Sequence, residues 1–402
     1  MSEKVYVTGL GIISSIGNNV DETLISLKNL RQGIGTIKYL DSRHKNIIPV
    51  CEIKFSDEEL VKIANVPHNK KYTRTALLGI IAAKQAVINS QILNDSHWRT
   101  GLISGTTVGG MGRTELYYNK YIDFNIFGDF LGYIETHDCG ESTERIAEFL
   151  KIKDYVTTIS TACSSSANAI MFGARLIKNN ILDRVIVGGT ESLTKFTLNG
   201  FNTLMILDKE SCKPFDENRS GLNLGEGAAY IVIESEKCIK SSEKEIFCEL
   251  SGYANANDAF HQTASSPDGL GAYLAMKNAL YKSELSTTDI DYINVHGTGT
   301  PNNDLSEGKA IQRLFSPDIP KFSSTKPYTG HTLGACGAIE AIFSILAIKH
   351  RIIYPNLNFE NPINELGFSP VKKIIKDVEI RNVMSNSFGF GGNNTSLIFS
   401  KC

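Results

Sequence analysis

The chain has 402 residues, of which 42% are hydrophobic and 21% charged, and its 41 basic and 43 acidic side chains leave a formal net charge of -2. This composition predicts a large core in one big or two fused domains, and it excludes collagen, disordered chains and disulfide-bonded miniproteins. The near-neutral balance provides no global field for nucleic acid or an anionic membrane, so an anionic partner would need a local basic patch.

Strand-like and helix-like runs alternate along the chain, which predicts an α/β fold. The expected elements of the first half are strand 4–13, helix 21–30, helix 72–88, strand 100–110, strand 155–161, helix 164–180, strand 184–192 and strand 228–235. The second half repeats the theme with strand runs at 247–255 and 291–300, a helix of small residues after His331, and the segment VMSNSFGFGGNNTSLIFS at 383–400. The two halves therefore look like distant copies.

No flexible linker separates the halves, and the polar run at 235–245 is the candidate boundary. We expect two intimately packed halves, residues 1–245 and 246–402. Residues 113–150 are aromatic and irregular, which favours a cap or a subunit contact, with an ordinary surface excursion as the alternative.

The chain shows no sign of a metal site or a membrane anchor. Its eight cysteines include no CxxC pair and no metal-ligand spacing, so we expect reduced thiols. The N-terminus lacks the apolar core of a signal peptide, and the longest helical apolar run, residues 338–348, is too short to cross a bilayer. We expect a cytoplasmic protein.

Cys163 lies where a predicted strand ends and a predicted helix begins. At a helix N-terminus, unpaired N–H groups and the helix dipole favour a thiolate, and such settings lower a thiol pKa to about 3.5–7.5. The alternative is a small buried residue, since free cysteine is often buried. His296 in NVHGTGTP and His331 in KPYTGHTLGACG lie in glycine-rich loops of the kind that frame sites, and a histidine that opens a helix tends to stay neutral.

Five motifs, in this order, resemble those of the β-ketoacyl-[acyl-carrier-protein] synthases, the condensing enzymes of the thiolase superfamily: TACSSS, FDENRSGLNLGEGA, NVHGTGTP, KPYTGHTLGACGAIE and NSFGFGGNN. The resemblance is nearest to synthase II and weakest at 113–150. It implies a thiolase fold, two βαβαβαββ halves stacked in five α-β-α-β-α layers, usually as a homodimer. It also implies a decarboxylative condensation that extends an acyl thioester with malonyl-acyl carrier protein to a 3-oxoacyl product, in fatty acid, polyketide or polyene biosynthesis.

The resemblance also implies roles for individual residues. Cys163 corresponds to the acylated nucleophile, His296 and His331 to the decarboxylation pair, Lys326 to the site lysine, Glu307 and Glu340 to supporting carboxylates, Phe390 to the gating residue with Phe388 beside it, and Thr298 and Thr300 to contacts of the phosphopantetheine arm. No permanently bound cofactor is implied.

These residue types suit the chemistry. Cysteine is a good acyl acceptor and leaving group, and two neutral imidazole N–H groups can stabilise the enolate formed as CO2 departs. The backbone N–H groups of Cys163 and Phe390 would form a second oxyanion hole, for the tetrahedral intermediate.

The acyl pocket is expected near Val108 and against residues 113–140, and Thr107 stands where housekeeping enzymes usually have glycine, so a specialised polyene or polyketide synthase is a variant of the prediction. Docking of the acidic carrier protein is expected at Lys70, Lys71, Arg74 and Lys213, although a solvated charged face is the alternative.

Two rival functions are less compatible with the residues. A thiolase needs a second, basic cysteine in the C-terminal glycine loop, where this chain has Phe388 and Phe390. A non-catalytic chain-length partner typically lacks the nucleophile, whereas Cys163 and both histidines are present here. The residues leave open that this chain is the active subunit of a heterodimer with such a partner.

Overall fold

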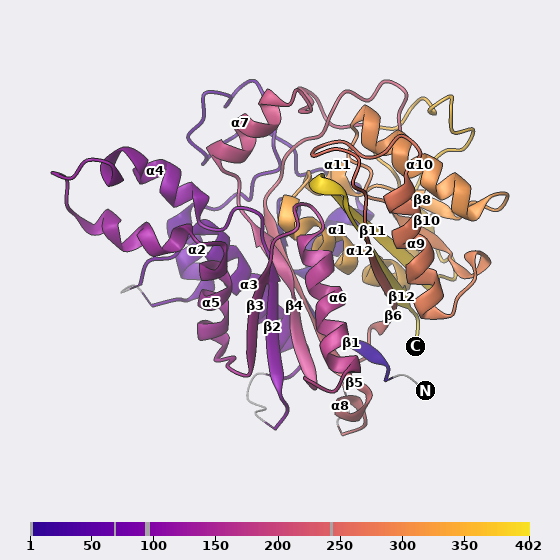
Figure 1. Ribbon diagram of the computed structural model, residues 1–402, viewed down its shortest axis with the longest axis horizontal. Helices are drawn as coiled ribbons and strands as arrows, with labels where there is room; N and C mark the ends of the chain where they lie inside the picture. Colours follow the sequence, from indigo (N-terminus) through magenta and orange to yellow (C-terminus); the bar gives the residue numbers. More distant parts are fainter. Residues whose placement is uncertain (1–2, 68–69, 93–96, 242–243) are drawn as a thin grey trace.

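Five strands of the N-terminal part form one half of a large mixed sheet (Figure 1). We analysed a computed structural model that describes residues 3–67, 70–92, 97–241 and 244–402. The strands lie in the order β3-β2-β4-β5-β1. Strand β2 is parallel to both β3 and β4, whereas β5 is antiparallel to β4 and β1. Their bounds are β1 Val5–Ser14, β2 Thr100–Gly105, β3 Tyr155–Ile159, β4 Arg184–Glu191 and β5 Gly227–Ser235.

The C-terminal part repeats this arrangement strand for strand, in the order β8-β7-β11-β12-β6. Strand β7 is parallel to β8 and β11, and β12 is antiparallel to β11 and β6. A short antiparallel pair between β1 and β6 joins the two halves into a 10-stranded sheet. The bounds are β6 Cys248–Asn257, β7 Tyr292–Asn294, β8 Lys321–Ser323, β11 Asn382–Gly389 and β12 Asn393–Ser400, with a separate pair of β9 Ile352–Ile353 and β10 Ile375–Lys376. The duplicated α/β fold expected from the sequence is confirmed.

Two helices, α6 (Ser165–Lys178) and α12 (Cys336–His350), contact each other and strands of both halves, and so form the central layer. Their small residues have a packing role, because a Cβ on Gly337 would lie only 2.8 Å from Cβ of Ala167. By length and composition alone, the stretch Leu333–His350 could span a membrane, so it is longer than the apolar run expected at 338–348. Within the protein, 89% of this stretch is buried.

The outer layers consist of α3 (Arg74–Asn89), which packs on β1 and β5, and α9 (Leu270–Ser283), which packs on β6 and β12, with α10 (Pro301–Phe315) beside α9. Helix α3 matches the run expected at 72–88, with its ends displaced by one or two residues, whereas α9 and α10 are not among the helices predicted from the sequence. Further helices are α1 Val20–Lys28, α2 Asp57–Ala64, α7 Lys195–Thr203, α8 Glu236–Lys240 and α11 Lys326–Thr329, with 3-10 turns η2 Thr287–Asp289, η3 Leu333–Ala335 and η4 Phe390–Gly392.

The segment from α4 (Met111–Tyr121) through η1 (Asp129–His137) extends from the body as an arm, seen at the left of Figure 1. Near its tip, Phe124 is 90% exposed and Phe127 is 80% exposed. The segment then continues into α5 (Cys139–Leu150), a regular helix that packs on α3 and begins where the Asp138 side chain accepts from the Gly140 N–H. The expectation of an irregular segment therefore differs from the structure at α5, because a capped amphipathic helix follows the aromatic run.

Candidate active site

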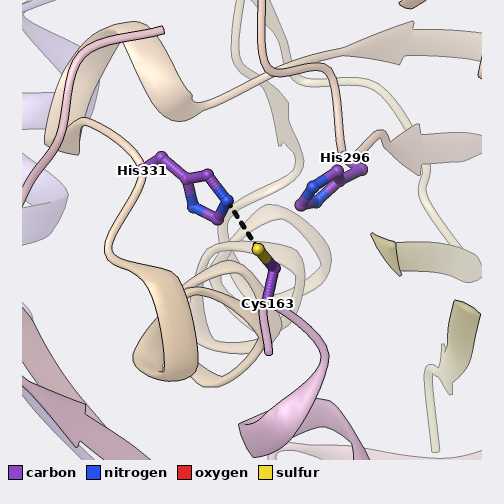
Figure 2. Close-up of side chains that lie close together, drawn as sticks. All are labelled: Cys163, His296 and His331. Atoms are coloured by element: carbon purple, nitrogen blue, oxygen red, sulfur yellow. Dashed lines mark hydrogen bonds between the residues drawn. The ribbon is translucent and has the colours of Figure 1, made fainter. Parts of the chain in front are cut away.

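A cavity opens at the N-terminal end of α6, and residues from both halves of the fold line it. Seven residues selected from the sequence line it, and three of them are drawn in Figure 2: Cys163, His296, Thr298, Thr300, His331, Phe388 and Phe390. The duplication explains this convergence, because the loops that follow β3 and β7 and the turn between β11 and β12 reach the same region.

Cys163 precedes Ser164, the N-cap residue of α6, and Ala162 before it has a left-handed backbone with φ 52°. The thiol is buried, and its Sγ is 3.1 Å from Nε2 of His331. Burial raises the pKa of Cys163 to about 11, although Lys326 and the backbone N–H groups of Phe390 and Cys163 lower it. This differs from the low pKa expected at a helix N-terminus, because loss of solvent outweighs the local dipoles. The resting nucleophile is a thiol.

His331 is held in one tautomer by its own loop. The backbone N–H of Leu333 donates to Nδ1 at 3.3 Å, so the neutral ring carries its proton on Nε2. That N–H points at the sulfur of Cys163, as Figure 2 shows. The backbone N–H of His331 also donates to the Asn223 carbonyl at 2.7 Å, which fixes the loop.

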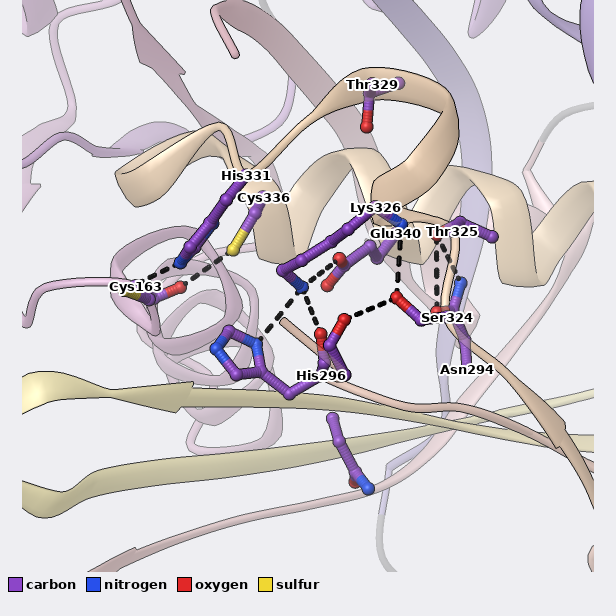
Figure 3. A network of polar contacts seen from close by, with 12 residues as sticks. Cys163, Asn294, His296, Ser324, Thr325, Lys326, Thr329, His331, Cys336 and Glu340 are labelled. Atoms are coloured by element: carbon purple, nitrogen blue, oxygen red, sulfur yellow. Dashed lines mark hydrogen bonds and ion pairs between the residues drawn. The ribbon is translucent and has the colours of Figure 1, made fainter. Parts of the chain in front are cut away.

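His296 is held in the same tautomer by a lysine. The Lys326 ammonium, which can only donate, lies 3.3 Å from Nδ1, so the proton of the ring sits on Nε2 (Figure 3). The carboxylate of Glu307 accepts from the N–H groups of His296 at 2.9 Å and Gly297 at 2.8 Å. Burial raises the pKa of Glu307 to about 7. This carboxylate acts on the backbone of the histidine and not on its ring.

Lys326 and Glu340 form an ion pair inside the protein, with Nζ and Oε1 2.6 Å apart and side-chain exposures of 1% and 4%. Burial opposes the charge of Lys326, but Glu340 outweighs it and the pKa of the lysine is raised. Burial raises the pKa of Glu340 to about 6, so the pair is ionised at neutral pH.

The two imidazoles are neutral donors that face one sulfur. Their ring centroids are 5.3 Å apart at 83°, and one ligand atom from each ring lies within 4.8 Å of the other and of the Cys163 sulfur. Burial lowers the pKa of both histidines well below 6.5, and Lys326 lowers it further. The three side chains are close enough to hold a metal ion, but the ammonium of Lys326 beside them repels a cation.

The turn between β11 and β12 supplies the other side of the site. The backbone N–H groups of Phe390 and Cys163 lie close enough to the sulfur to lower the pKa of Cys163. Gly391 and Gly392 both have φ 77°, a region that favours glycine, and a Cβ on Gly392 would lie 1.8 Å from the Asp258 carbonyl oxygen. Phe390 stacks on Phe201 of α7, with ring centroids 5.7 Å apart.

Thr298 and Thr300 line the cavity, and their hydroxyl oxygens are 2.9 Å apart. Sequence reasoning missed several further lining residues that belong to no motif, among them Phe201, Met205 and Asn302. Phe201 lies in α7, Met205 follows that helix and Asn302 lies in α10, so the packing of these helices brings them to the cavity. Asn394 also lines it, and its place within NSFGFGGNN was the available signal.

Two expectations receive no support from the described residues. Val108 is in the turn after β2 and is not among the described residues that line the cavity, and none of residues 113–140 lines it in the described part of this chain either. Arg74 is not a docking residue at the surface: its side chain is 13% exposed, and it pairs with Glu226 at 2.6 Å and Asp57 at 3.0 Å. Lys70 and Lys71 are partly exposed and pair with Glu148 and Asp129, and Lys213 is partly buried.

A buried thiol between two backbone donors and two neutral imidazoles, on a duplicated α/β fold, defines a thiol-dependent acyltransferase. The family models for the N-terminal and C-terminal domains of beta-ketoacyl synthases match residues 2–238 and 247–360. The chain belongs to the beta-ketoacyl synthase family.

Known proteins are similar over the full length. The 3-oxoacyl-[acyl-carrier-protein] synthase 2 of Staphylococcus aureus (strain N315) is 33% identical and covers 100% of this chain and 99% of its own. Among solved structures, the ishigamide ketosynthase/chain length factor has a TM-score of 0.93 at 28% identity, with 100% of both chains covered. A ketosynthase in complex with its chain length factor from Xenorhabdus doucetiae has a TM-score of 0.84 at 29% identity, and covers 100% of this chain and 98% of that one.

Proposed function

We propose that this protein condenses an acyl group held on Cys163 with malonyl-acyl carrier protein, releasing CO2 and forming a 3-oxoacyl-acyl carrier protein. The observation that carries the proposal is the pair of Nε2–H groups of His296 and His331, which face the sulfur of Cys163 and are each locked by a partner at Nδ1. Two neutral donors at one point match the charge that decarboxylation places on a thioester oxygen.

In the first half-reaction, the sulfur of Cys163 attacks the acyl thioester carbon. The bond from that carbon to the donor sulfur breaks, and the thiol proton of Cys163 passes to the leaving sulfur. The backbone N–H groups of Cys163 and Phe390 stabilise the oxyanion of the tetrahedral intermediate. The pKa of Cys163 is raised, so its thiolate needs stabilisation as it forms. The Nε2–H of His331, 3.1 Å from the sulfur, provides it.

In the second half-reaction, the malonyl thioester loses CO2 as its carbon–carbon bond breaks, and the electron pair enters an enolate. His296 and His331 donate to the enolate oxygen. The carbanion carbon then attacks the acyl carbon on Cys163, and the released thiolate takes up a proton. Lys326 donates to Nδ1 of His296 throughout, so the proton of this ring stays on Nε2 and points into the cavity.

Both substrates would arrive on the phosphopantetheine arm of acyl carrier protein. Thr298 and Thr300 are suited to contact the arm because they line the cavity and carry hydroxyl groups. Lys70, Lys71 and Lys213 stay candidates for docking of the acidic carrier. The cytoplasmic location also stays a prediction.

A panel of saturated, unsaturated and aryl acyl-carrier proteins tests the function and defines the acyl substrate. After incubation, mass spectrometry weighs the peptide that contains Cys163. We expect acyl groups on this peptide and CO2 release when malonyl carrier protein follows. Labelling of another thiol, with Cys163 unmodified by every donor, would contradict the proposal.

A second possibility is that this chain is the active subunit of a specialised polyene or polyketide heterodimer. Similarity to two ketosynthase/chain length factor structures favours it. The exposed Phe124 and Phe127 of the arm, together with the sheet-edge strand β3, offer a surface for a homodimer or a heterodimer. Sedimentation of the purified chain, combined with an activity assay, distinguishes the two functions. An active homodimer supports a synthase that works alone, and an inactive monomer supports a subunit that needs a chain-length partner.

A further inference from the structure

A cluster of three asparagines lies behind the oxyanion hole. Asn393 is the first residue of β12, directly after the GFGG turn. Its Oδ1 is 2.7 Å from Nδ2 of Asn255, 2.8 Å from Nδ2 of Asn168 and 2.7 Å from Oγ of Ser164. These donors come from β6, from α6 and from the residue after Cys163, so one amide oxygen joins three separate parts of the chain.

The cluster is tied in further at both ends. Nδ2 of Asn168 also donates to the hydroxyl of Thr161 at 2.9 Å, on the loop that leads to Cys163. The hydroxyl of Thr395 donates to Oδ1 of Asn168 at 2.7 Å, and Nδ2 of Asn255 donates to that hydroxyl at 2.9 Å. Asn168 is 6% exposed and Thr395 is 0% exposed, whereas Asn255 and Asn393 are partly buried. A largely buried polar network in which each member has partners favours one arrangement.

This position matters because the two donors of the oxyanion hole belong to different segments. The N–H of Cys163 is on the α6 side, whereas the N–H of Phe390 is on the turn, and Ser164 and Asn393 are 229 residues apart in sequence. On its other side, the turn is hydrogen-bonded to a different loop. The Gly391 N–H donates to the Gln262 carbonyl at 2.7 Å, and the Asp258 N–H donates to the Gly392 carbonyl at 2.7 Å. Those two bonds hold the turn to the 258–262 loop and not to α6.

We propose that Asn393 is a positioning residue: its side-chain oxygen clamps the turn that carries the Phe390 N–H against the start of α6, and so sets the spacing of the two donors that receive the acyl oxygen. This inference rests on the proposed function. The amide is neutral, so it fixes the geometry without adding charge beside the developing oxyanion. Asn168 and Asn255 share the role as its donors.

The two half-reactions give the test, because the clamp acts on the acylation hole and not on the imidazole pair. For Asn393→Ala, we expect acylation of Cys163 by an acyl-carrier protein to slow by about 10- to 100-fold, the scale of a displaced catalytic donor. Release of CO2 from malonyl-carrier protein without an acyl donor should stay within about twofold of the wild type, since His296 and His331 are held by Lys326 and Leu333.

A double-mutant cycle shows whether the residues act as one unit. Asn168→Ala should slow acylation in the same direction, and Asn168→Ala/Asn393→Ala should be little slower than the slower single variant. Asn382→Ala is the matched control: it removes an amide that donates to the Asp289 carbonyl at 2.8 Å, at the far end of the same β11–β12 hairpin, and it should acylate normally. Asn393→Ser, a smaller truncation, serves if the alanine variant does not fold.

Normal acylation by a folded Asn393 variant, or an equal loss of both half-reactions, would overturn the inference. A wild-type protein that neither acylates Cys163 nor releases CO2 would instead overturn the proposed function.

Discussion

Nζ of Lys326 lies 3.3 Å from Nδ1 of His296, inside the protein, and the lysine side chain is only 1% exposed. The ammonium also donates to the His296 carbonyl oxygen and to Glu340. An ammonium has no lone pair, so His296 must present its proton from Nε2 toward the cavity. The Lys326 ammonium thus sets the tautomer of His296 and also keeps this imidazole neutral by lowering its pKa.

Replacing His331 should separate the two half-reactions. For His331→Ala, we expect CO2 release from malonyl-carrier protein to fall by about 100- to 1,000-fold, because one of two enolate donors is lost. Acylation of Cys163 should remain measurable by mass spectrometry of its peptide. Normal CO2 release by this variant would contradict the assignment.

The reactivity of Cys163 should depend steeply on pH. Because burial raises its pKa to about 11, only the small thiolate fraction reacts at neutral pH, and that fraction grows about tenfold per pH unit below the pKa. We expect the iodoacetamide rate at Cys163 to climb from pH 7 to pH 9 without a plateau. The rate is read on the Cys163 peptide, and a plateau below pH 8 would show a thiolate at rest.

The Lys326–Glu340 pair should be costly to break from one side. For Lys326→Met or Glu340→Gln, we expect a loss of about 3–5 kcal/mol in the free energy of unfolding, because one charge is left buried without its partner. The double variant should recover part of this loss, as urea unfolding of the four proteins would measure. Losses that simply add would show that the two charges do not interact.

The buried histidines should make the protein less stable in acid. Their folded-state pKa lies well below the unfolded value of 6.5, so the unfolded chain binds more protons and stability falls as the pH drops below about 6.5. Glu307 and Glu340, whose pKa values are raised to about 7 and about 6, act in the opposite direction, so the histidine effect must be isolated. We expect His296→Gln/His331→Gln to lose less melting temperature between pH 7 and pH 5.5 than the wild type. An identical loss would count against neutral histidines.

Docking by Lys70 and Lys71 can be separated from catalysis. For Lys70→Glu/Lys71→Glu, we expect a higher KM for acyl-carrier protein and an unchanged KM for an acyl pantetheine that lacks the protein. The wild-type KM for the carrier should also rise with ionic strength. Lys401→Glu, at the C-terminal end of the chain, is the matched control. A KM for the carrier protein that does not change with ionic strength would contradict electrostatic docking at Lys70 and Lys71.

The sequence alone determined the features that local pattern controls. Alternating strand and helix periodicities predicted the duplicated α/β fold, and the junction before α6 placed Cys163 at a helix start. The glycine-rich loops singled out His296 and His331, because loops with special backbone geometry are recognisable without knowing their neighbours.

Only the tertiary structure decided how these residues act on each other. The bond between His331 and Cys163 spans 168 residues, and the clamp from Asn393 to Ser164 spans 229, so no local pattern contains either contact. The sequence also did not reveal which groups are buried. Burial raises the pKa of Cys163, which the helix start alone predicted to be low, and Arg74, predicted at the surface, is mostly buried and pairs with Glu226. Desolvation depends on every element packed around a group, and that environment exists only once the chain has folded.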